Sequence, residues 1–340
     1  AFLFDNVSIP EMVNFAVGNV LSAESDCCGR NYYVYRDSEG TGRWHMMRWD
    51  VDKSLGRQGT TDPERWKFRL DIGRLYAGAN NLLGDLFGVP EFKAMYLRRM
   101  RTVLDELFQP PGTPGDERAL SQRIDELAEQ LAPDVAAEFA AWPSRGAVET
   151  WPEQIELFKN EYFERRRVFL YGLVGDMDFS GTVDRDDIDD FVLGLTDPAA
   201  YEARYGVHPS VRGDTNFEVP WVIHYPSHTG KDDERVYDRN MALDFDDIPR
   251  FIAFVNGARQ HAAPVPPAQV GVPEIQFGEI DFAPVSGNQD EEFIELSNPH
   301  AVAVDISGWR LEGGVEYQFK PGVVLPPRGS LYVTPNFNAF

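Results

Sequence analysis

Two short segments near the start of the chain carry residues that could do chemistry. Asp26 and Asn31 lie in the first, and Asp50 and Asp52 lie in the second, after a strand-like run and a turn. Phosphoryl transfer needs such a set: one carboxylate accepts the proton of the attacking hydroxyl, while an Asn and a second carboxylate hold the Mg²⁺ ions that bridge the nucleotide phosphates. Protein kinases place these groups in this order. Asp and Asn are also common turn residues, and on spacing alone a polar turn before a hairpin is the better interpretation.

The residues around these positions favour the phosphoryl-transfer interpretation. Residues 31–37 read NYYVYRD, and residues 42–56 read GRWHMMRWDVDKSLG. These runs resemble the core of the CotH spore-coat kinase family, in which N-Y-Y-L-Y-R-D precedes a strand that ends in W-D-x-D. The resemblance covers residues 1–173. It includes the helical run FKAMYLRRM at 92–100 and the later run YFERRRVFL at 162–170.

The resemblance implies an atypical protein-kinase fold and a set of site residues. Asp26 would be the catalytic carboxylate. Asn31 and Asp50 would be ligands of the Mg²⁺ that accompanies ATP, and Asp52 would be a further group facing the metal. The family implies transfer of phosphate from ATP to Ser or Thr of a protein substrate.

The chain departs from the common kinase pattern upstream of Asp26. Glu24 and Ser25 precede this Asp in place of His-Arg. A kinase also needs a phosphate-binding Lys, a Glu partner for it and a covering loop before the catalytic carboxylate. The 25 residues before Asp26 contain no Lys and no glycine-rich loop, and the chain begins at Ala1 without Met. We therefore expect a C-terminal fragment of a longer kinase, and expect these residues alone not to transfer phosphate.

The composition restricts the partners. The chain has 340 residues, with 55 Asp and Glu against 32 Lys and Arg, and a formal net charge of −23. Such an acidic protein is a poor ligand for nucleic acid or anionic membranes, and no apolar run is long enough to span a membrane. We expect a secreted or cell-surface protein with a protein substrate or another surface protein as partner. The length predicts two or three domains.

The only cysteines are the neighbours Cys27 and Cys28. Adjacent cysteines meet ordinary disulfide geometry poorly. We expect two partly buried small residues rather than a redox pair, with a vicinal disulfide beside Asp26 as the open alternative.

An EF-hand-type loop is the clearest metal motif in the chain. Such a loop needs oxygen ligands at positions 1, 3, 5, 7, 9 and 12, with a Gly at position 6 for the sharp turn. Counting from residue 176, Gly181 is at position 6. The motif favours Ca²⁺ over a merely acidic loop. The predicted ligands are Asp176, Asp178, Ser180, Thr182, Asp184 and Asp187.

Position 12 of this loop is Asp rather than the usual Glu, and a helix is predicted from there to about Leu195. This pattern resembles the dockerin type I repeat, in which one loop precedes one helix and the repeats come in pairs. A second repeat starts at Gly213 and is interrupted by an insertion at 219–243. An insertion can loop out because the entropy of loop closure grows slowly with length. We expect a weaker second calcium site there, with the ligands Asp214, Asn216, Glu218, Asp244 and Asp247.

The last part of the chain switches to strand patterns after a Pro/Ala-rich linker at 258–272. Short alternating strands with Gly, Pro and Asn turns predict a β-sandwich. The run EFIELSNP at 292–299 and the run VDISGWRL at 304–311 resemble the lamin-tail domain, an immunoglobulin-like sandwich. Trp309 is expected in its core, and the sandwich is expected to be truncated.

The predicted organisation is a multidomain α+β protein. Residues 1–173 form the C-terminal part of an atypical protein-kinase-like fold, 174–257 a mostly helical EF-hand/dockerin-like module, and 273–340 the sandwich. The helix at 92–100 carries Arg98, Arg99 and Arg101, for which a solvated face or internal ion pairs are favoured over phosphate binding. The leading hypothesis is a fragment of a secreted CotH-like kinase with a calcium module and an adhesion-type sandwich. The alternative is a non-catalytic, calcium-stabilised surface or assembly scaffold.

Overall fold

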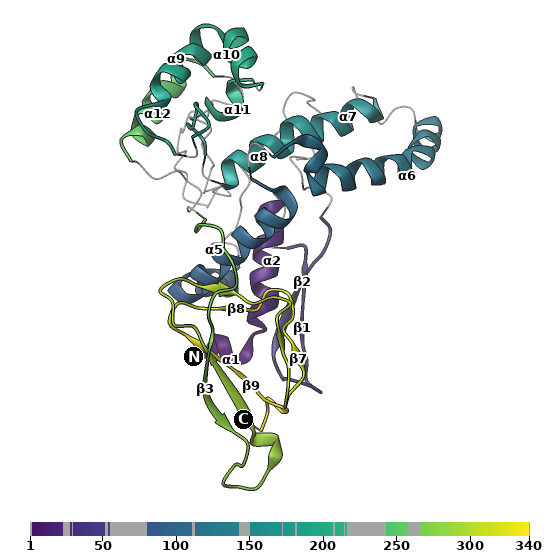
Figure 1. The fold of residues 1–340 in the computed structure, drawn as a ribbon. Helices are drawn as coiled ribbons and strands as arrows, with labels where there is room; N and C mark the ends of the chain where they lie inside the picture. Colours follow the sequence, from purple (N-terminus) through teal and green to yellow (C-terminus); the bar gives the residue numbers. More distant parts are fainter. Residues whose placement is uncertain are drawn as a thin grey trace, which may run out of the picture. The chain divides into compact units, whose positions relative to one another are not determined.

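The computed structural model describes residues 2–22, 28, 30–51, 54, 80–110, 113–142, 150–171, 173–180, 182–206, 208–213, 215, 243–257 and 265–339. The chain divides into two compact units. Unit 1 comprises Ala1–Ser54, Arg74–Val103 and Pro266–Phe340, and unit 2 comprises Leu55–Gly73 and Leu104–Val265. The architecture is mixed, with helices in the N-terminal part and strands at the C-terminal end (Figure 1).

The N-terminal part of unit 1 consists of helices packed beside one hairpin. Its elements are α1 (Phe2–Asn6), α2 (Ile9–Leu21), β1 (Tyr32–Arg36), β2 (Trp44–Arg48), α4 (Asn81–Phe87) and α5 (Pro90–Val103). α2 begins at Ile9 and has Pro10 in its first turn, where a missing N–H costs least. α2 lies against both α5 and β2. β1 and β2 pair antiparallel, with Tyr32 opposite Arg48.

The sandwich forms the C-terminal part of unit 1. Its elements are β3 (Gln276–Asp281), η6 (Gln289–Glu291), β4 (Phe293–Ser297), β5 (Val304–Asp305), β6 (Arg310–Leu311), β7 (Tyr317–Gln318), β8 (Val324–Leu325) and β9 (Ser330–Val333). The strands form one three-stranded sheet in the order β3-β4-β9 and the pairs β5-β8 and β6-β7. Trp309 packs, as expected, against a buried core that consists of Leu296, Val304, Ile306, Phe319 and Leu325. β7 was not predicted.

Unit 2 is helical. Its elements are η1 (Leu104–Phe108), η2 (Gly115–Glu117), α6 (Ala119–Ala141), α7 (Trp151–Leu157), η4 (Phe158–Tyr162), α8 (Phe163–Leu170), α9 (Asp187–Thr196), α10 (Pro198–Tyr205), α11 (Ser210–Gly213), η5 (Phe245–Asp247) and α12 (Ile248–Val255). The core between α9, α10 and α12 consists of Met177, Phe191, Tyr201 and Phe251. The helix after the first acidic loop is confirmed at Asp187, with Thr196 as its last residue.

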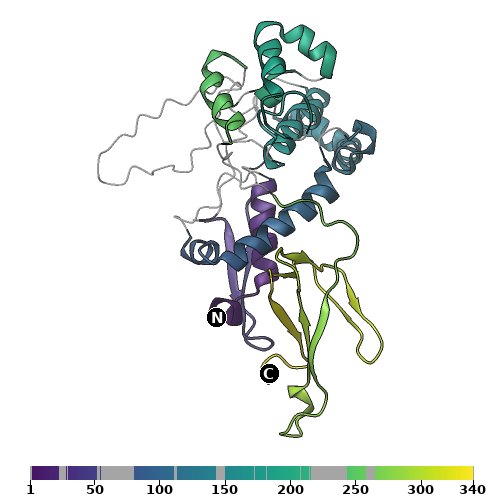
Figure 2. The same ribbon diagram turned by 60° about the vertical axis from the view of Figure 1, so that its left-hand side comes forward.

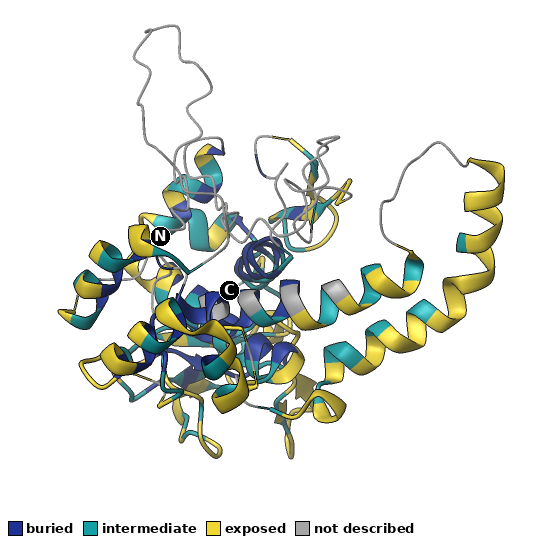
Figure 3. Ribbon diagram, turned by 90° about the horizontal axis from the view of Figure 1, so that it is seen from above, coloured by how far each residue is buried: buried dark blue, intermediate teal, exposed yellow. Residues whose placement is uncertain are grey.

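α6 is the one long helix of the described part of the chain that has no buried residue. Its apolar residues recur at three and four positions and include Leu127 and Leu131, which are 37% and 43% exposed. The exposed colouring runs along most of the helix in Figure 3. This spacing is typical of a helix. It does not lead to burial here, because the main neighbours of α6 are the short elements α7, η1 and η2.

Two arginines of α5 are buried, so of the two favoured expectations the solvated face is wrong for them. Arg98 and Arg99 are 4% and 9% exposed. Arg99 makes an internal ion pair with Asp305, as the other favoured expectation has it.

Candidate functional site

The structure brings two of the predicted magnesium ligands together at the open end of the β1–β2 hairpin. Asn31 directly precedes β1, and Asp50 follows β2. The Asn31 amide nitrogen donates to the Asp50 carbonyl oxygen at 3.4 Å, and the Trp49 N–H donates to the Asn31 carbonyl oxygen at 3.1 Å. Both residues have a left-handed backbone, with φ of 61° and 53°. Non-glycine residues in this conformation are strained, and such strain gathers at functional sites.

The loop before this hairpin is only partly described. Asp26 and Asp52 lie outside the described residues. Cys28 is fully buried and disulfide-bonded, so the favoured expectation of a partly buried small residue is wrong for it, and the open alternative, a disulfide, is what the structure has there. Cys27, the only other cysteine, lies outside the described residues. The Cys28 carbonyl oxygen accepts a hydrogen bond at 3.0 Å from Asn80, the N-cap of α4, a contact that local sequence patterns do not signal.

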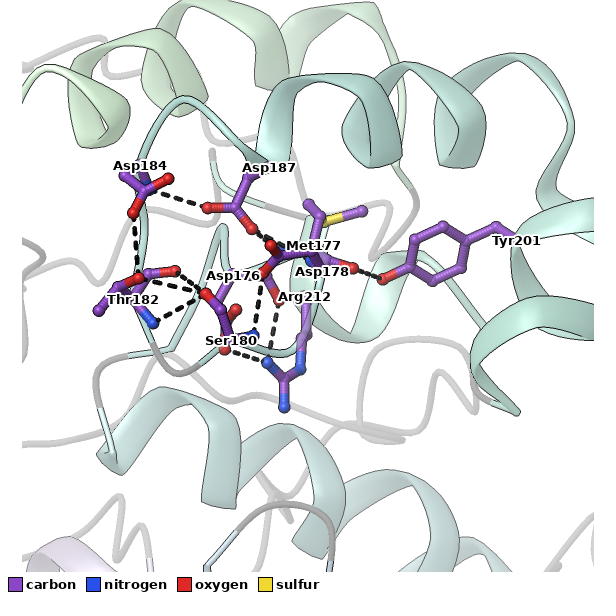
Figure 4. A network of polar contacts seen from close by, with 9 residues as sticks. All are labelled: Asp176, Met177, Asp178, Ser180, Thr182, Asp184, Asp187, Tyr201 and Arg212. Atoms are coloured by element: carbon purple, nitrogen blue, oxygen red, sulfur yellow. Dashed lines mark hydrogen bonds and ion pairs between the residues drawn. The ribbon is translucent and has the colours of Figure 1, made fainter.

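The acidic loop before α9 brings three of its predicted ligands together. Asp176, Asp178 and Asp187 each offer a carboxylate oxygen, and these atoms all lie within 4.8 Å of one another. Figure 4 shows them converging inside the loop. A cluster of hard carboxylate oxygens in a flexible loop suits Ca²⁺ better than Mg²⁺, which demands near-ideal octahedral geometry. The donor set therefore fits the predicted ion.

Asp187 organises the loop. One of its carboxylate oxygens accepts from the Met177 and Asp178 N–H groups at 2.5 and 3.1 Å, and the other accepts from the Asp184 N–H at 2.8 Å. The loop is closed further by the Asp186 N–H, which donates to the Asp184 carboxylate at 2.9 Å. The last ligand position thus ties both ends of the loop to the start of α9.

The remaining predicted ligands bond to one another. The Ser180 hydroxyl lies 3.1 Å from the Thr182 hydroxyl, which donates to the Asp184 carboxylate at 3.1 Å. Asp184 is not part of the 4.8 Å group, in line with position 9 of such loops, which often binds through water. Gly181 lies outside the described residues.

Arg212 is a site residue that sequence reasoning missed. Its guanidinium donates to the Asp176 carbonyl oxygen at 2.9 Å and forms a buried ion pair with the same residue's carboxylate. It also lies over the Phe179 ring, 3.7 Å from the centroid. A cation in the loop would share Asp176 with this guanidinium, which lowers the net negative charge available to it. No spacing rule signals this contact, because α9 and α10 lie between the two residues in the sequence.

Burial and hydrogen bonds shift the pKa values of three groups at the acidic loop. Burial raises the pKa of Asp187, against the effect of the backbone N–H groups that it accepts. Burial also acts to raise the pKa of Asp178, but hydrogen bonds from Ser180 outweigh it and hold this pKa below its usual value. Tyr201 donates to the Met177 carbonyl oxygen at 2.8 Å, and burial raises the pKa of its phenol.

The interrupted second loop is closed in the same way as the first. Asp247 accepts from the Thr215 N–H at 2.6 Å and from the Asp244 N–H at 2.9 Å, and the Asp246 N–H donates to the Asp244 carboxylate at 2.8 Å. These bonds join positions 2, 9, 11 and 12, the positions that Asp187 and its partners join in the first loop. The predicted ligands Asp214, Asn216 and Glu218, and most of the insertion, lie outside the described residues.

Comparison with family models finds two regions of this chain. Residues 3–170 match the model described as CotH kinase protein, and residues 269–339 match the Lamin Tail Domain. The chain carries a CotH kinase domain. Its second domain is a lamin tail domain, in agreement with the strand pairs observed there. No curated protein matches the chain. Among the described residues, no helix is both long enough and apolar enough to cross a membrane.

Proposed function

We propose that this chain is part of a protein kinase that transfers phosphate from ATP to Ser or Thr of a secreted or surface protein. The observation that carries the proposal is the meeting of Asn31 and Asp50 at one end of the hairpin, within the region that matches the CotH model. Their oxygens are of the type that Mg²⁺ binds. Both residues have a left-handed backbone, a conformation that Gly adopts without steric cost and other residues adopt less readily.

The residues have different roles in this proposal. Asp50 and Asn31 would hold the ion that accompanies ATP, and Asp52 would support them. Because the Asn31 amide nitrogen donates to the Asp50 carbonyl, the amide oxygen is the atom left to face a cation. The ion supplies charge neutralisation to the nucleotide phosphates. Asp26 would accept the proton of the attacking hydroxyl.

The test compares two variants of the intact protein. Asp50→Asn removes a carboxylate from the metal and should weaken binding of Mg²⁺-ATP together with turnover. Asp26→Asn should leave nucleotide binding and lower turnover, since general-base assistance is worth about 10²–10⁴-fold. The control is Glu39→Gln at the exposed far turn of the same hairpin. If both variants phosphorylate a protein acceptor at the parent rate, the kinase proposal fails.

A second proposal concerns unit 2, where the convergence of Asp176, Asp178 and Asp187 supports calcium binding. The equivalent closure at Asp247 supports a second, weaker site. If the kinase proposal fails, calcium binding would favour the alternative function, a non-catalytic scaffold stabilised by Ca²⁺.

Calorimetric titration of the full chain with Ca²⁺ tests this second proposal. Asp178→Asn keeps the shape of the side chain and removes one charge, so we expect Ca²⁺ affinity to fall on the order of 10–100-fold. The matched control is Asp189→Asn, on an exposed position of α9. The absence of binding heat, or an equal loss of affinity in the control, would exclude this site.

A further inference from the structure

A buried ion pair joins the sandwich to α5. The Arg99 guanidinium donates to the Asp305 carboxylate at 3.1 Å, with the two side chains 11% and 2% exposed. Asp305 also accepts from the Ser307 N–H and hydroxyl at 2.9 and 2.5 Å. Arg99 donates in addition to the Asn14 side chain of α2 at 3.1 Å. Buried charges persist only when they are paired and hydrogen-bonded, as both are here.

The segment that leads into the sandwich is also bound to α5. Arg98 donates to the carbonyl oxygens of Pro267 and Ala303 at 2.8 and 2.9 Å, and Arg101 donates to the Pro266 carbonyl oxygen at 3.2 Å. The end of the predicted linker is thus held by α5. Figures 1 and 2 show α5 lying along β8 and α2.

The sandwich also touches α2 directly. Asn14 donates to the Pro321 carbonyl oxygen at 2.9 Å. Next to it, Gly322 has a φ of 89°, and a Cβ at this position would collide with the Pro10 carbonyl oxygen and with Asn14. Only Gly allows the turn to approach the helix this closely.

The last described residues of the chain reach the far turn of the β1–β2 hairpin. Asn338 donates to the Gly40 carbonyl oxygen at 2.7 Å. The Arg43 guanidinium carbon lies 3.8 Å from the centre of the Phe337 ring. The sandwich therefore contacts the hairpin itself, in addition to α2 and α5.

The hairpin is fixed to α2 along its length. The Ser8 N–H donates to the Trp44 carbonyl oxygen at 2.9 Å, and His45 lies 2.6 Å from the Glu11 carboxylate. Near the other end, Arg48 donates to the Ser22 hydroxyl at 2.7 Å. A continuous set of contacts thus runs from the sandwich, through α2 and the hairpin, to the end that carries the two predicted magnesium ligands.

We propose that the lamin-tail sandwich is a brace for the CotH domain, which fixes the β1–β2 hairpin and so positions Asn31 and Asp50. The effect on phosphate transfer rests on the function proposed above, whereas the brace itself is a property of the fold. Arg99 and Asp305 are positioning residues in this proposal. They act through α2 and the hairpin and touch no substrate.

The experiment measures backbone hydrogen exchange in the full chain for Arg99→Met, Asp305→Leu and the double variant. Each single variant leaves one buried charge without its partner. We expect it to raise exchange in β1 and β2 on the order of tenfold or more, and to lower the melting temperature of unit 1 by roughly 6–20 °C. The double variant replaces the pair by apolar groups and should recover most of the protection. Exposed Arg310 of β6 supplies the matched control, Arg310→Met.

A single variant that fails to fold would be replaced by Asn338→Ala, which removes only the contact with the hairpin turn. It should raise exchange at residues 36–44 and leave α9 and α12 unchanged. Unchanged exchange in the hairpin in Asn338→Ala and in every folded variant of the pair would overturn the brace. Loosening of the hairpin without a change in Mg²⁺-ATP binding, measured with the same variants in the intact protein, would support the brace and count against the proposed role of Asn31 and Asp50.

Discussion

At the residue scale, the left-handed backbone of Asn31 allows its structural role to be tested separately from its proposed role as a magnesium ligand. Its φ of 61° suits Gly without strain and disfavours β-branched residues. We predict that Asn31→Gly leaves the free energy of unfolding nearly unchanged and weakens Mg²⁺-ATP binding in the intact protein. Asn31→Val should lower the free energy of unfolding by about 1–3 kcal/mol. Denaturant unfolding of the full chain measures both values.

The same prediction applies to Asp50, because its backbone is also left-handed, with a φ of 53°. Asp50→Gly should also keep the hairpin and lose the carboxylate. Equal unfolding free energies for the Gly and Val variants at position 31 would show that the left-handed backbone imposes no constraint there.

Local sequence patterns predicted some residues of the candidate sites and not others. The Asp and Gly spacing of the acidic loop predicted three ligands that converge, because all of them lie in one short loop. Arg212 was not predictable, since its ion pair with Asp176 spans 36 residues and uses no motif. A disulfide at Cys28 was only the open alternative in the prediction, because adjacent cysteines ordinarily argue against one.

At the element scale, one buried arginine binds the carbonyl groups at the end of η1. Arg167 of α8 donates to the Phe108 carbonyl oxygen at 2.9 and 2.7 Å and to the Gln109 carbonyl oxygen at 2.9 Å. These carbonyls are among those that a helix end leaves without intrahelical partners. Its guanidinium also pairs with Glu164, which pairs with Arg118.

We predict that Arg167→Met lowers the free energy of unfolding by about 3–5 kcal/mol, because it leaves buried carbonyls and part of a buried carboxylate without a donor. The control is Arg123→Met on α6, whose side chain is 61% exposed and whose ion pair should contribute below about 1 kcal/mol. Denaturant titration of both variants measures the two losses of unfolding free energy. Similar losses in the two would mean that Arg167 does not hold the helix end.

Helices and strands were predictable where the local spacing of apolar residues determines them. α9 and both strands of the β1–β2 hairpin lie close to the predicted positions. The burial of an element was less predictable, because it depends on partners far away in the chain. α6 has a clear apolar stripe and no buried residue, whereas the Arg-rich face of α5 is buried under the sandwich.

At the scale of the whole molecule, the compact units do not follow the order of the predicted modules. Unit 1 joins two stretches of the CotH region, which end at Ser54 and Val103, to the sandwich, and unit 2 holds the rest of that region with the acidic loops. The bond between Arg98 and the Ala303 carbonyl spans 205 residues. No pattern in either segment signals this pairing, so the sequence predicted a chain of separate modules instead of interleaved units.

This division predicts a selective effect of calcium. All three residues of the 4.8 Å carboxylate group lie in unit 2. Ligand at about 100 times its Kd stabilises a folded state by about 2.7 kcal/mol. For a unit of this size, that corresponds to roughly 5–10 °C in melting temperature. Scanning calorimetry of the full chain should therefore show two transitions, of which calcium chelation lowers only one.

Variants in each of the two units show which unit gives the transition that calcium chelation shifts. Asp178→Asn should reduce its shift to about half or less. Asp305→Leu should move only the other transition, because its ion pair lies in unit 1. Replacing Ca²⁺ by Mg²⁺ should give a smaller shift, since a flexible loop of carboxylates suits the larger ion. If chelation moves both transitions together, the two units unfold as one. If chelation moves neither, the acidic loop does not bind calcium, and the repulsion among its carboxylates is balanced by Arg212 and the backbone N–H groups alone.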